Sequence, residues 1–281
     1  MNRPFAPLET IDISCLGGLR FVDRASGRPI VVGLSVTVNR KGVSRPLAAS
    51  PSGCFALHRF PGFKASERWD GLGNPPAPAE PFQVSVIDTS GDFLSMQFPS
   101  RLPVGKETGF WCATAPGPIL PVPLYSSPSR RSPAGFQRLR GWLVDRDTGQ
   151  PGPWARIRVT SAEAQVSARS VLGEGMTDEN GSFLVPIRTP TPDPAPALAP
   201  GPPPPLVFRI IVEAGASAGM RDALPDLCDV LARPAVELLA RLPAQTLAAQ
   251  EIKLGQELIL QTLRTSNGQV VMGPELFFAA H

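Results

Sequence analysis

The sequence contains few of the side chains on which most catalytic sites depend. It has two histidines, His58 and His281, and a single tyrosine, Tyr125. A three-histidine zinc site cannot be built from this chain alone, and a Ser-His-Asp triad would have to use one of two isolated imidazoles. His58 lies just after the predicted inward-facing Phe55 and Leu57, so we expect it on an outer face. We therefore favour a non-catalytic protein and assign it no catalytic, cofactor-binding or metal-binding residue.

Four acidic residues lie in predicted turns. They are Asp145, Asp147, Asp178 and Glu179. Calcium takes several oxygen ligands, and carboxylates gathered from loops can supply them. Asp also caps turns by accepting hydrogen bonds from backbone N–H groups, which needs no ion. The sequence favours turn capping and leaves open whether calcium binds near Asp145, Asp147 and Asp178.

The cysteines do not form a metal-binding pattern. Cys15, Cys54, Cys112 and Cys228 are far apart and include no CxxC pair. Zinc sites usually draw two ligands from one such tight turn. We interpret the four cysteines as free, reduced thiols. A Cys15–Cys54 or Cys54–Cys112 disulfide is the alternative if the protein ends up outside the cell.

Charge and hydropathy exclude two classes of partner. Lys and Arg number 27 against 24 Asp and Glu, and the densest basic run is Arg130-Arg131. Nucleic-acid binders gather basic residues into a stripe, and this chain scatters them. The N-terminus lacks the apolar stretch of a signal peptide, and no window is long and apolar enough to span a membrane. We expect cytoplasmic synthesis, with neither a nucleic-acid partner nor a membrane span.

Proline and glycine determine which elements can position these residues. The 281 residues include 34 Pro and 26 Gly. Proline lacks the backbone N–H and clashes with the preceding helical turn, so this chain cannot consist mainly of long helices. Apolar residues make up 42% of the chain, which is enough to bury a core. The composition predicts short strands joined by many turns.

The two halves of the chain repeat one another. Residues 20–29 match residues 142–151, with Val, Asp, Arg, Gly and Pro in register and Asp145 placed 122 residues after Asp23. Three more blocks follow in the same order: 34–37 match 157–160, 51–57 match 179–185, and 82–86 match 208–212. Four matches in one order indicate a duplicated domain with loop insertions.

Each repeated block predicts β structure. Leu34, Val36 and Val38 alternate with polar residues, which is the period of a half-buried strand. The Asp-x-x-x-Gly-x-Pro segments predict turns. Asn180-Gly181 predicts a type I′ hairpin, a turn that requires positive φ at both central residues. The sequence thus predicts an all-β protein of two tandem antiparallel Ig-like sandwiches with Pro-rich loops.

The repeated motif resembles the carboxypeptidase regulatory-like domain, which is a transthyretin-like or Ig-like β-sandwich. The first copy has Ser50-Pro51-Ser52 where the motif has Thr-Asp. The second copy carries the motif nearly whole, in Gly141, Val144, Asp145, Thr148, Gly149, Pro151, Val159, Thr177, Asp178, Gly181 and Phe183. The resemblance implies two tandem copies of an accessory, positioning or adhesive module. The fold also resembles that of intradiol ring-cleaving dioxygenases, whose iron takes two Tyr and two His; this chain cannot supply that set.

The repeat suggests the following domain organisation. Residues 1–114 form the first sandwich, 115–135 a Pro/Ser-rich linker, and 136–281 the second sandwich with a Pro-rich insertion and a C-terminal extension. Residues 119–125 are a candidate last strand of the first sandwich. The pattern at 214–250 leaves open a helix that begins at Pro234 or a strand through Val236.

Two further features of the C-terminal half are interpretable from the sequence. Residues 258–260 and 270–272 predict a hairpin around Ser266-Asn267-Gly268. The proline tract at 190–205 predicts an extended polyproline insertion.

Fold and composition together favour a structural or interaction protein. Ig-like domains made without a signal peptide occur in phage tails, so we expect an accessory component of a phage-tail-like or contractile injection particle, with protein subunits as partners. The alternative is a carbohydrate- or surface-binding module that uses Trp69, Trp111 or Trp142. Trp69 lies in a Gly/Pro-rich insertion and could equally anchor that loop to its own sandwich. A third option is an enzyme that uses carboxylates alone.

Overall fold

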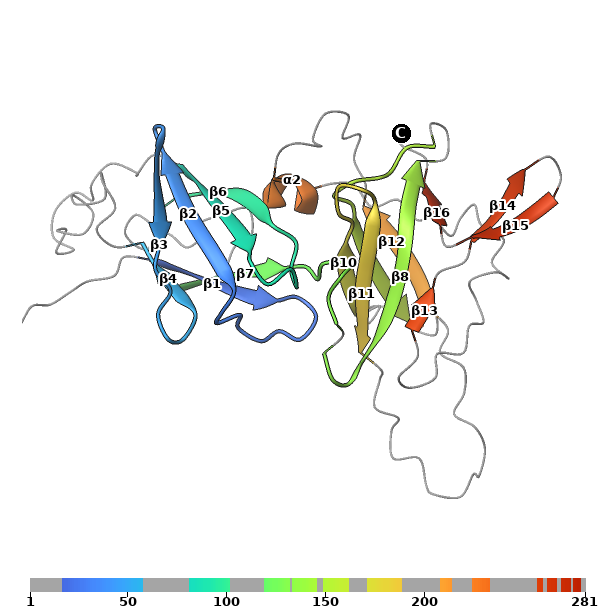
Figure 1. Ribbon diagram of the computed structural model, residues 1–281, viewed down its shortest axis with the longest axis horizontal. Coiled ribbons are helices and arrows are strands. Elements are labelled where there is room, and N and C mark those ends of the chain that lie inside the picture. Colours follow the sequence, from blue (N-terminus) through green and yellow to red (C-terminus); the bar gives the residue numbers. More distant parts are fainter. Residues whose placement is uncertain are drawn as a thin grey trace, which may run out of the picture.

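Strands account for nearly all the regular structure in this computed structural model, as the sequence predicts for an all-β protein (Figure 1). None of the described helices is long and apolar enough to cross a membrane. The structure describes residues 17–57, 81–101, 119–131, 133–145, 149–161, 171–188, 208–213, 224–232, 257–259, 262–266, 269–273 and 275–278.

Two sheets near the N-terminus form what we call the first sheet pair. One has the strand order β4-β1-β7 and the other β3-β2-β5-β6. Strand β7 runs parallel to β1, and the remaining pairings are antiparallel. The bounds are β1 (Gly18–Asp23), β2 (Leu34–Arg40), β3 (Val43–Leu47), β4 (Cys54–Ala56), β5 (Phe82–Asp88), β6 (Met96–Ser100) and β7 (Ile119–Leu124).

Alternation of apolar and polar residues determines which face of each strand is buried. In β5, Phe82, Val84 and Val86 are buried, and the intervening residues are more exposed. The facing sheet contributes Phe21 and Phe55, whose rings meet edge to face at 5.6 Å. Such a core between two sheets defines a β-sandwich.

A second sheet pair repeats this arrangement. Its sheets have the orders β11-β8-β13, with β16 also paired to β8, and β10-β9-β12. Strands β13 and β16 run parallel to β8, as β7 does to β1. The bounds are β8 (Phe136–Asp145), β9 (Arg156–Ser161), β10 (Val171–Met176), β11 (Ser182–Arg188), β12 (Phe208–Glu213), β13 (Glu257–Ile259) and β16 (Glu275–Phe278).

The duplication predicted from the sequence extends to single backbone contacts. The isolated bridge between Val22 and Pro29 recurs between Val144 and Pro151. The bridge between Ala49 and Phe55 recurs as Thr177–Phe183, and the pairing of β1 with β4 recurs in the same register as β8 with β11. Equivalent residues therefore occupy equivalent positions in both copies.

The last repeated block is displaced by two residues from the sequence alignment. Val36 of β2 pairs with Val86 of β5, and its counterpart Val159 of β9 pairs with Ile210 of β12. The sequence alignment instead made Val212 the counterpart of Val86. A shift of two keeps the same residues facing inward, so alternation alone cannot detect it.

The predicted hairpin at Asn180-Gly181 is wrong. Gly181 has a φ of 74°, but Asn180 is absent from the described non-glycine residues with positive φ. Strands β10 and β11 belong to different sheets, and the segment between them is closed by the isolated Thr177–Phe183 bridge and by a hydrogen bond from the Asp178 N–H to the Ser182 carbonyl. A turn with positive φ at both central positions instead joins β2 to β3, at Lys41 and Gly42, which the sequence analysis missed.

The C-terminal hairpin is placed correctly but pairs different strands. β14 (Thr262–Ser266) pairs antiparallel with β15 (Gln269–Gly273), so the turn lies where the sequence predicts it. The predicted partner segment contributes β13 to the sheet of β8 instead. Residue 260, the proline tract at 190–205 and the segment 233–250 lie outside the described residues.

Helix α2 (Leu227–Ala232) packs on the first sheet pair although it lies between β12 and β13 of the second pair in the chain. Leu227 and Val230 join the apolar cluster of the first pair, and α2 contacts β6. Asp226 caps the helix by accepting hydrogen bonds from the backbone N–H groups of Cys228 and Asp229. In Figure 1, α2 lies between the two sheet pairs.

Gly181 provides a test of the duplicated turn. A Cβ at this position would lie 2.5 Å from the carbonyl oxygen of Leu143 at a φ of 74°. We expect Gly181→Ala to lower the free energy of unfolding by about 3 kcal/mol, because steric overlap adds to the cost of positive φ. The matched control is Gly149→Ala, with a φ of 68° and open space around the position, which should cost about 1 kcal/mol. Urea denaturation measures both, and equal losses would contradict the close approach.

Candidate functional site

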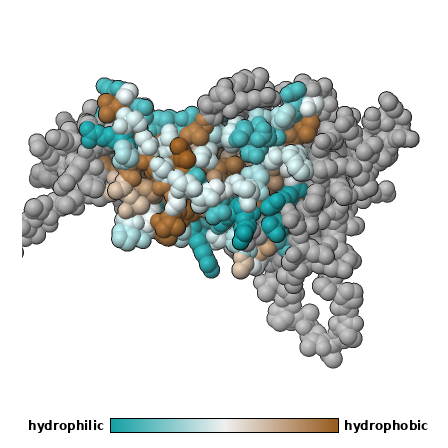
Figure 2. Space-filling view, in the orientation of Figure 1, coloured by the Kyte–Doolittle hydropathy of each residue, from teal (hydrophilic) through white to brown (hydrophobic). Residues whose placement is uncertain are grey.

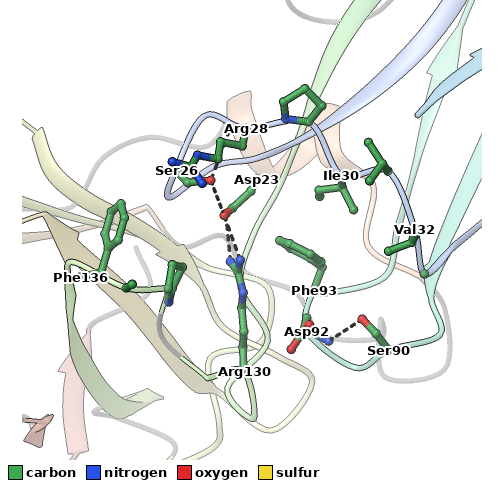
Figure 3. A pocket seen from close by; sticks show the side chains of 15 residues that line it. Asp23, Ser26, Arg28, Ile30, Val32, Ser90, Asp92, Phe93, Arg130 and Phe136 are labelled. Carbon is green, nitrogen blue, oxygen red and sulfur yellow. Dashed lines mark hydrogen bonds and ion pairs between the residues drawn. The ribbon is translucent and has the colours of Figure 1, made fainter. Parts of the chain in front are cut away.

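A hollow of about 600 Å³ opens beside the Asp23 turn, and we call it the Asp23 hollow (Figure 3). Loops of the first sheet pair form most of its lining, and the segment that leads into β8 closes one side. The lining residues are Asp23, Ser26, Arg28, Pro29, Ile30, Val31, Val32, Gly33, Ser90, Asp92, Phe93, Arg130, Pro133, Ala134 and Phe136.

A buried ion pair forms the floor of this hollow. The Arg130 guanidinium donates from both terminal nitrogens to the two Asp23 carboxylate oxygens, each at 2.9 Å. One of these nitrogens also donates to Ser126 Oγ at 2.8 Å, and the guanidinium carbon lies 4.3 Å from the centre of the Phe93 ring. Bidentate pairing and stacking on an aromatic ring use the planar shape of arginine, which lysine lacks.

Asp23 also organises its own turn. Its carboxylate accepts hydrogen bonds from the backbone N–H of Ala25 and the hydroxyl of Ser26. Burial by itself raises the pKa of Asp23, but the hydrogen bonds from Arg130 and Ser26 and the Arg130 charge outweigh it, so the pKa lies below its ordinary value. The carboxylate therefore stays ionised near neutral pH and serves as a structural anchor.

The rim of the hollow combines apolar surface with two free charges. Val31 is 47% exposed and Val32 is 79% exposed. Arg28 and Asp92 are both exposed, and among the described residues neither side chain has a polar partner. Figure 2 shows hydrophobic residues gathered on the side formed by the first sheet pair. This rim can contact an apolar partner that also carries charge.

A second polar cluster joins the two sheet pairs. Arg24 donates to both carboxylate oxygens of Glu174 in β10, at 2.7 and 2.9 Å. Hydrogen bonding to Glu174 raises the pKa of Arg24. Trp154 and Met176 of the second pair belong to the same apolar cluster as the core of the first. The junction therefore combines a charge-assisted contact with buried apolar surface.

Asp178 caps its turn, as the sequence analysis favours. Its Oδ1 accepts hydrogen bonds from the backbone N–H groups of Asn180 and Ser182, both at 2.8 Å. Burial raises the pKa of Asp178. In the first copy Ser50 takes its place, because Ser50 Oγ accepts the hydrogen bond of Cys54 N–H. The described residues contain no group of three or more His, Cys, Asp or Glu side chains that could hold a metal ion.

Of the remaining residues singled out in the sequence analysis, the structure describes Tyr125 and Trp142. Residues 119–124 pair with β1 as the closing strand that the sequence offered within the predicted linker, and Tyr125 at the end of this strand is almost fully buried. Trp142 is 45% exposed on β8. Residues 58, 69, 111, 147 and 281 lie outside the described part of the chain, as does the side chain of Asp145.

The cysteines do not all match the predicted state of free thiols. Cys228 is disulfide-bonded, which corrects that prediction for this residue. Cys54 is free. Hydrogen bonds from Ser52 and then Arg20 lower the pKa of the Cys54 thiol. The wide spacing of the cysteines in the sequence did not indicate this disulfide.

Comparison with known proteins gives weak structural likenesses only. No family model and no curated protein matches the sequence. The TIE protein of Bacillus anthracis aligns over 70% of this chain with 14% identity and a TM-score of 0.23, and the chain spans 27% of that protein. A shaft pilin of Lactobacillus rhamnosus GG (11% identity, TM-score 0.22) and a DUF3823 family protein of Bacteroides ovatus (10% identity, TM-score 0.21) also align over 70% of this chain, which spans 86% and 89% of them.

These likenesses are too weak to transfer a family or a function. The β-sandwich fold rests on the sheets themselves.

The ion pair at the floor of the hollow predicts a specific pH dependence. We expect Asp23→Asn to lower the free energy of unfolding at pH 7 by about 3 kcal/mol, because it leaves the Arg130 charge buried without its partner. A depressed carboxylate pKa stabilises the fold above the unfolded value of about 3.9, and this contribution is lost as pH falls through the lower folded value. The difference between wild type and variant should therefore shrink below about pH 4.

Denaturation with urea at pH 7 and pH 3 measures this difference. The matched control is Asp92→Asn, whose exposed carboxylate has no side-chain partner among the described residues and should change stability by less than about 0.5 kcal/mol. A difference between wild type and Asp23→Asn that is the same at both pH values would contradict the role of the charged pair.

Proposed function

We propose that this protein is a non-catalytic structural or interaction protein whose two sheet pairs act as one rigid unit. The junction carries the proposal: Arg24 and Glu174 pair bidentately, and Trp154 joins the apolar cluster of the first pair. A scaffold or display protein needs its modules held at a fixed spacing. A flexible tether between independent modules would not need buried aromatic surface at the junction.

The use of the buried carboxylates supports the same proposal. Among the described residues the buried acidic side chains are Asp23 and Glu174, and each is held by an arginine through two hydrogen bonds. A general acid or base has to exchange a proton near the working pH. Asp23 is held in its ionised form by its lowered pKa, so its properties suit an anchor better than a catalyst.

The finer family assignment is part of the proposal. We propose two tandem carboxypeptidase regulatory-like modules, each with an Asp-x-x-x-Gly-x-Pro turn. The equivalent turn glycines Gly27 and Gly149 have φ values of 71° and 68°, and Asp178 caps the turn before β11. These features support an accessory or positioning role, which is what such modules supply to larger proteins.

We propose two alternatives for what this unit binds. The first is an accessory role in a phage-tail-like or contractile injection particle, assembled in the cytoplasm from protein subunits. The second is a carbohydrate- or surface-binding module, which the exposed Trp142 on β8 favours. The disulfide at Cys228 also favours a final location in oxidising surroundings, where such bonds persist.

Co-sedimentation from the native cells tests the proposed role. We expect a tagged chain expressed at its natural level to sediment with a large assembly, and mass spectrometry should identify sheath, tube or baseplate subunits if the assembly is a particle. Binding to purified cell-surface polysaccharide that is lost in Trp142→Ala would instead support the carbohydrate- or surface-binding module. A chain that remains a free monomer without polysaccharide binding would refute the proposal.

Rigidity is tested at the junction itself. We expect Trp154→Ala to destabilise the protein by about 3–5 kcal/mol, because it removes a buried indole from the shared cluster. Small-angle scattering should then show a broader distribution of distances between the sheet pairs. The matched control is Trp142→Ala, an exposed tryptophan on β8. Unchanged scattering and stability in Trp154→Ala would contradict the rigid unit.

A further inference from the structure

The duplication identifies a docking loop in the second copy and its counterpart in the first. Counted forward from the equivalent Pro29 and Pro151, Trp154 corresponds to Val32; counted back from the equivalent Leu34 and Ile157, it corresponds to Val31. Trp154 is 5% exposed, has a φ of 55° and lies in the apolar cluster of the first sheet pair. The second copy thus uses this loop to pack against a neighbouring sandwich.

Among the described residues, the same loop of the first copy has no such neighbour. Val32 is 79% exposed, and Val31 beside it is 47% exposed. Both line the Asp23 hollow, whose wall also includes the side chains of Phe93 and Phe136 (Figure 3). An exposed apolar loop next to an open apolar hollow is the form of an unfilled docking surface.

The charges around the hollow indicate which partner fits it. Arg28 and Asp92 lie on opposite sides of Phe93 in Figure 3. Neither is paired with another side chain among the described residues, and both are exposed. One free cation and one free anion flanking an apolar centre make the surface complementary to itself. A two-fold axis through the centre would bring each Arg28 onto the Asp92 of the other copy.

We propose that the Asp23 hollow is a self-association surface, on which a second copy of this chain docks through a two-fold axis. Val32 of each copy enters the hollow of the other, and two Arg28–Asp92 pairs form at the rim. This inference builds on the proposed function by naming one partner of the scaffold. The small apolar contact and the exposed charges predict weak association, with a dissociation constant on the order of 10–100 µM, that weakens further with added salt.

Charge reversal is the sharpest test. Arg28→Asp and Asp92→Arg should each abolish the dimer, because each homodimer then opposes like charges at both rims. An equimolar mixture of the two variants should dimerise again, since both rim pairs become complementary in the heterodimer. The double variant Arg28→Asp/Asp92→Arg should dimerise alone for the same reason. Sedimentation equilibrium at several loading concentrations measures each association constant.

The apolar contact is tested by a matched pair of valines. Val32→Asp should raise the dissociation constant at least tenfold. Val43→Asp changes a 50% exposed valine on β3 that does not line the hollow, and it should leave the constant within twofold. Circular dichroism of every variant checks that the fold is intact.

The outcomes separate this inference from the proposed function. A wild-type chain that stays monomeric at several hundred micromolar, a mixture of charge variants that does not recover, or equal effects of Val32→Asp and Val43→Asp would each overturn the docking surface. Such a chain could still sediment with a large assembly, which would leave the scaffold role in place. Conversely, a reversible dimer without any larger assembly or surface ligand would support the docking surface and count against the proposed function.

Discussion

The rest of the structure depends on the bidentate pair between Asp23 and Arg130. Asp23 ends β1 and closes its own turn through Ala25 and Ser26, whereas Arg130 lies on the segment that leads out of β7 towards β8. The two side chains are only 11% and 7% exposed, so breaking the pair would leave a poorly hydrated charge without its ionic partner, at a cost above that of a surface ion pair. The loop that carries Phe93 under the guanidinium is held in turn by Asp88, whose carboxylate accepts the Phe93 N–H. Three separate segments therefore share one anchor.

Arg24, the residue after Asp23, connects the same turn to the second sheet pair. Arg24 binds Glu174 of β10, so two neighbouring residues hold two different segments: Asp23 holds the segment that leads to β8, and Arg24 holds β10. Trp154 and Met176 remove apolar surface from water at the same junction. Arg24 is 45% exposed and its ion pair alone would add little, so burial of the tryptophan supplies most of the stabilisation and the ion pair sets the orientation.

Turn chemistry and strand alternation made the all-β fold and the duplication predictable from the sequence. Asp23, Gly27 and Pro29 are types that specify a local turn, and Val84 and Val86 specify an inward face. The errors share a physical cause, which is that each depends on contacts between distant segments. Asn180-Gly181 joins two sheets because the Asp178 carboxylate takes the N–H groups of the turn, and Lys41 adopts positive φ without a sequence signal. The candidate site escaped prediction because Arg130 lies 107 residues after Asp23.

Duplication also explains why an apolar loop is exposed in one copy only. After a domain duplicates, both copies present the same loop, and the loop of the second copy is buried against the first copy. No described segment covers the loop of the first copy, so this loop would be expected to be polar unless a partner covers it. It has instead kept Val31 and Val32, smaller than tryptophan yet still apolar, beside a hollow with one free charge at each rim. Val32 is 79% exposed and therefore buries little apolar area in the monomer, so it adds little to the stability of the isolated fold. A partner that buries Val32 explains better why an apolar residue stands there.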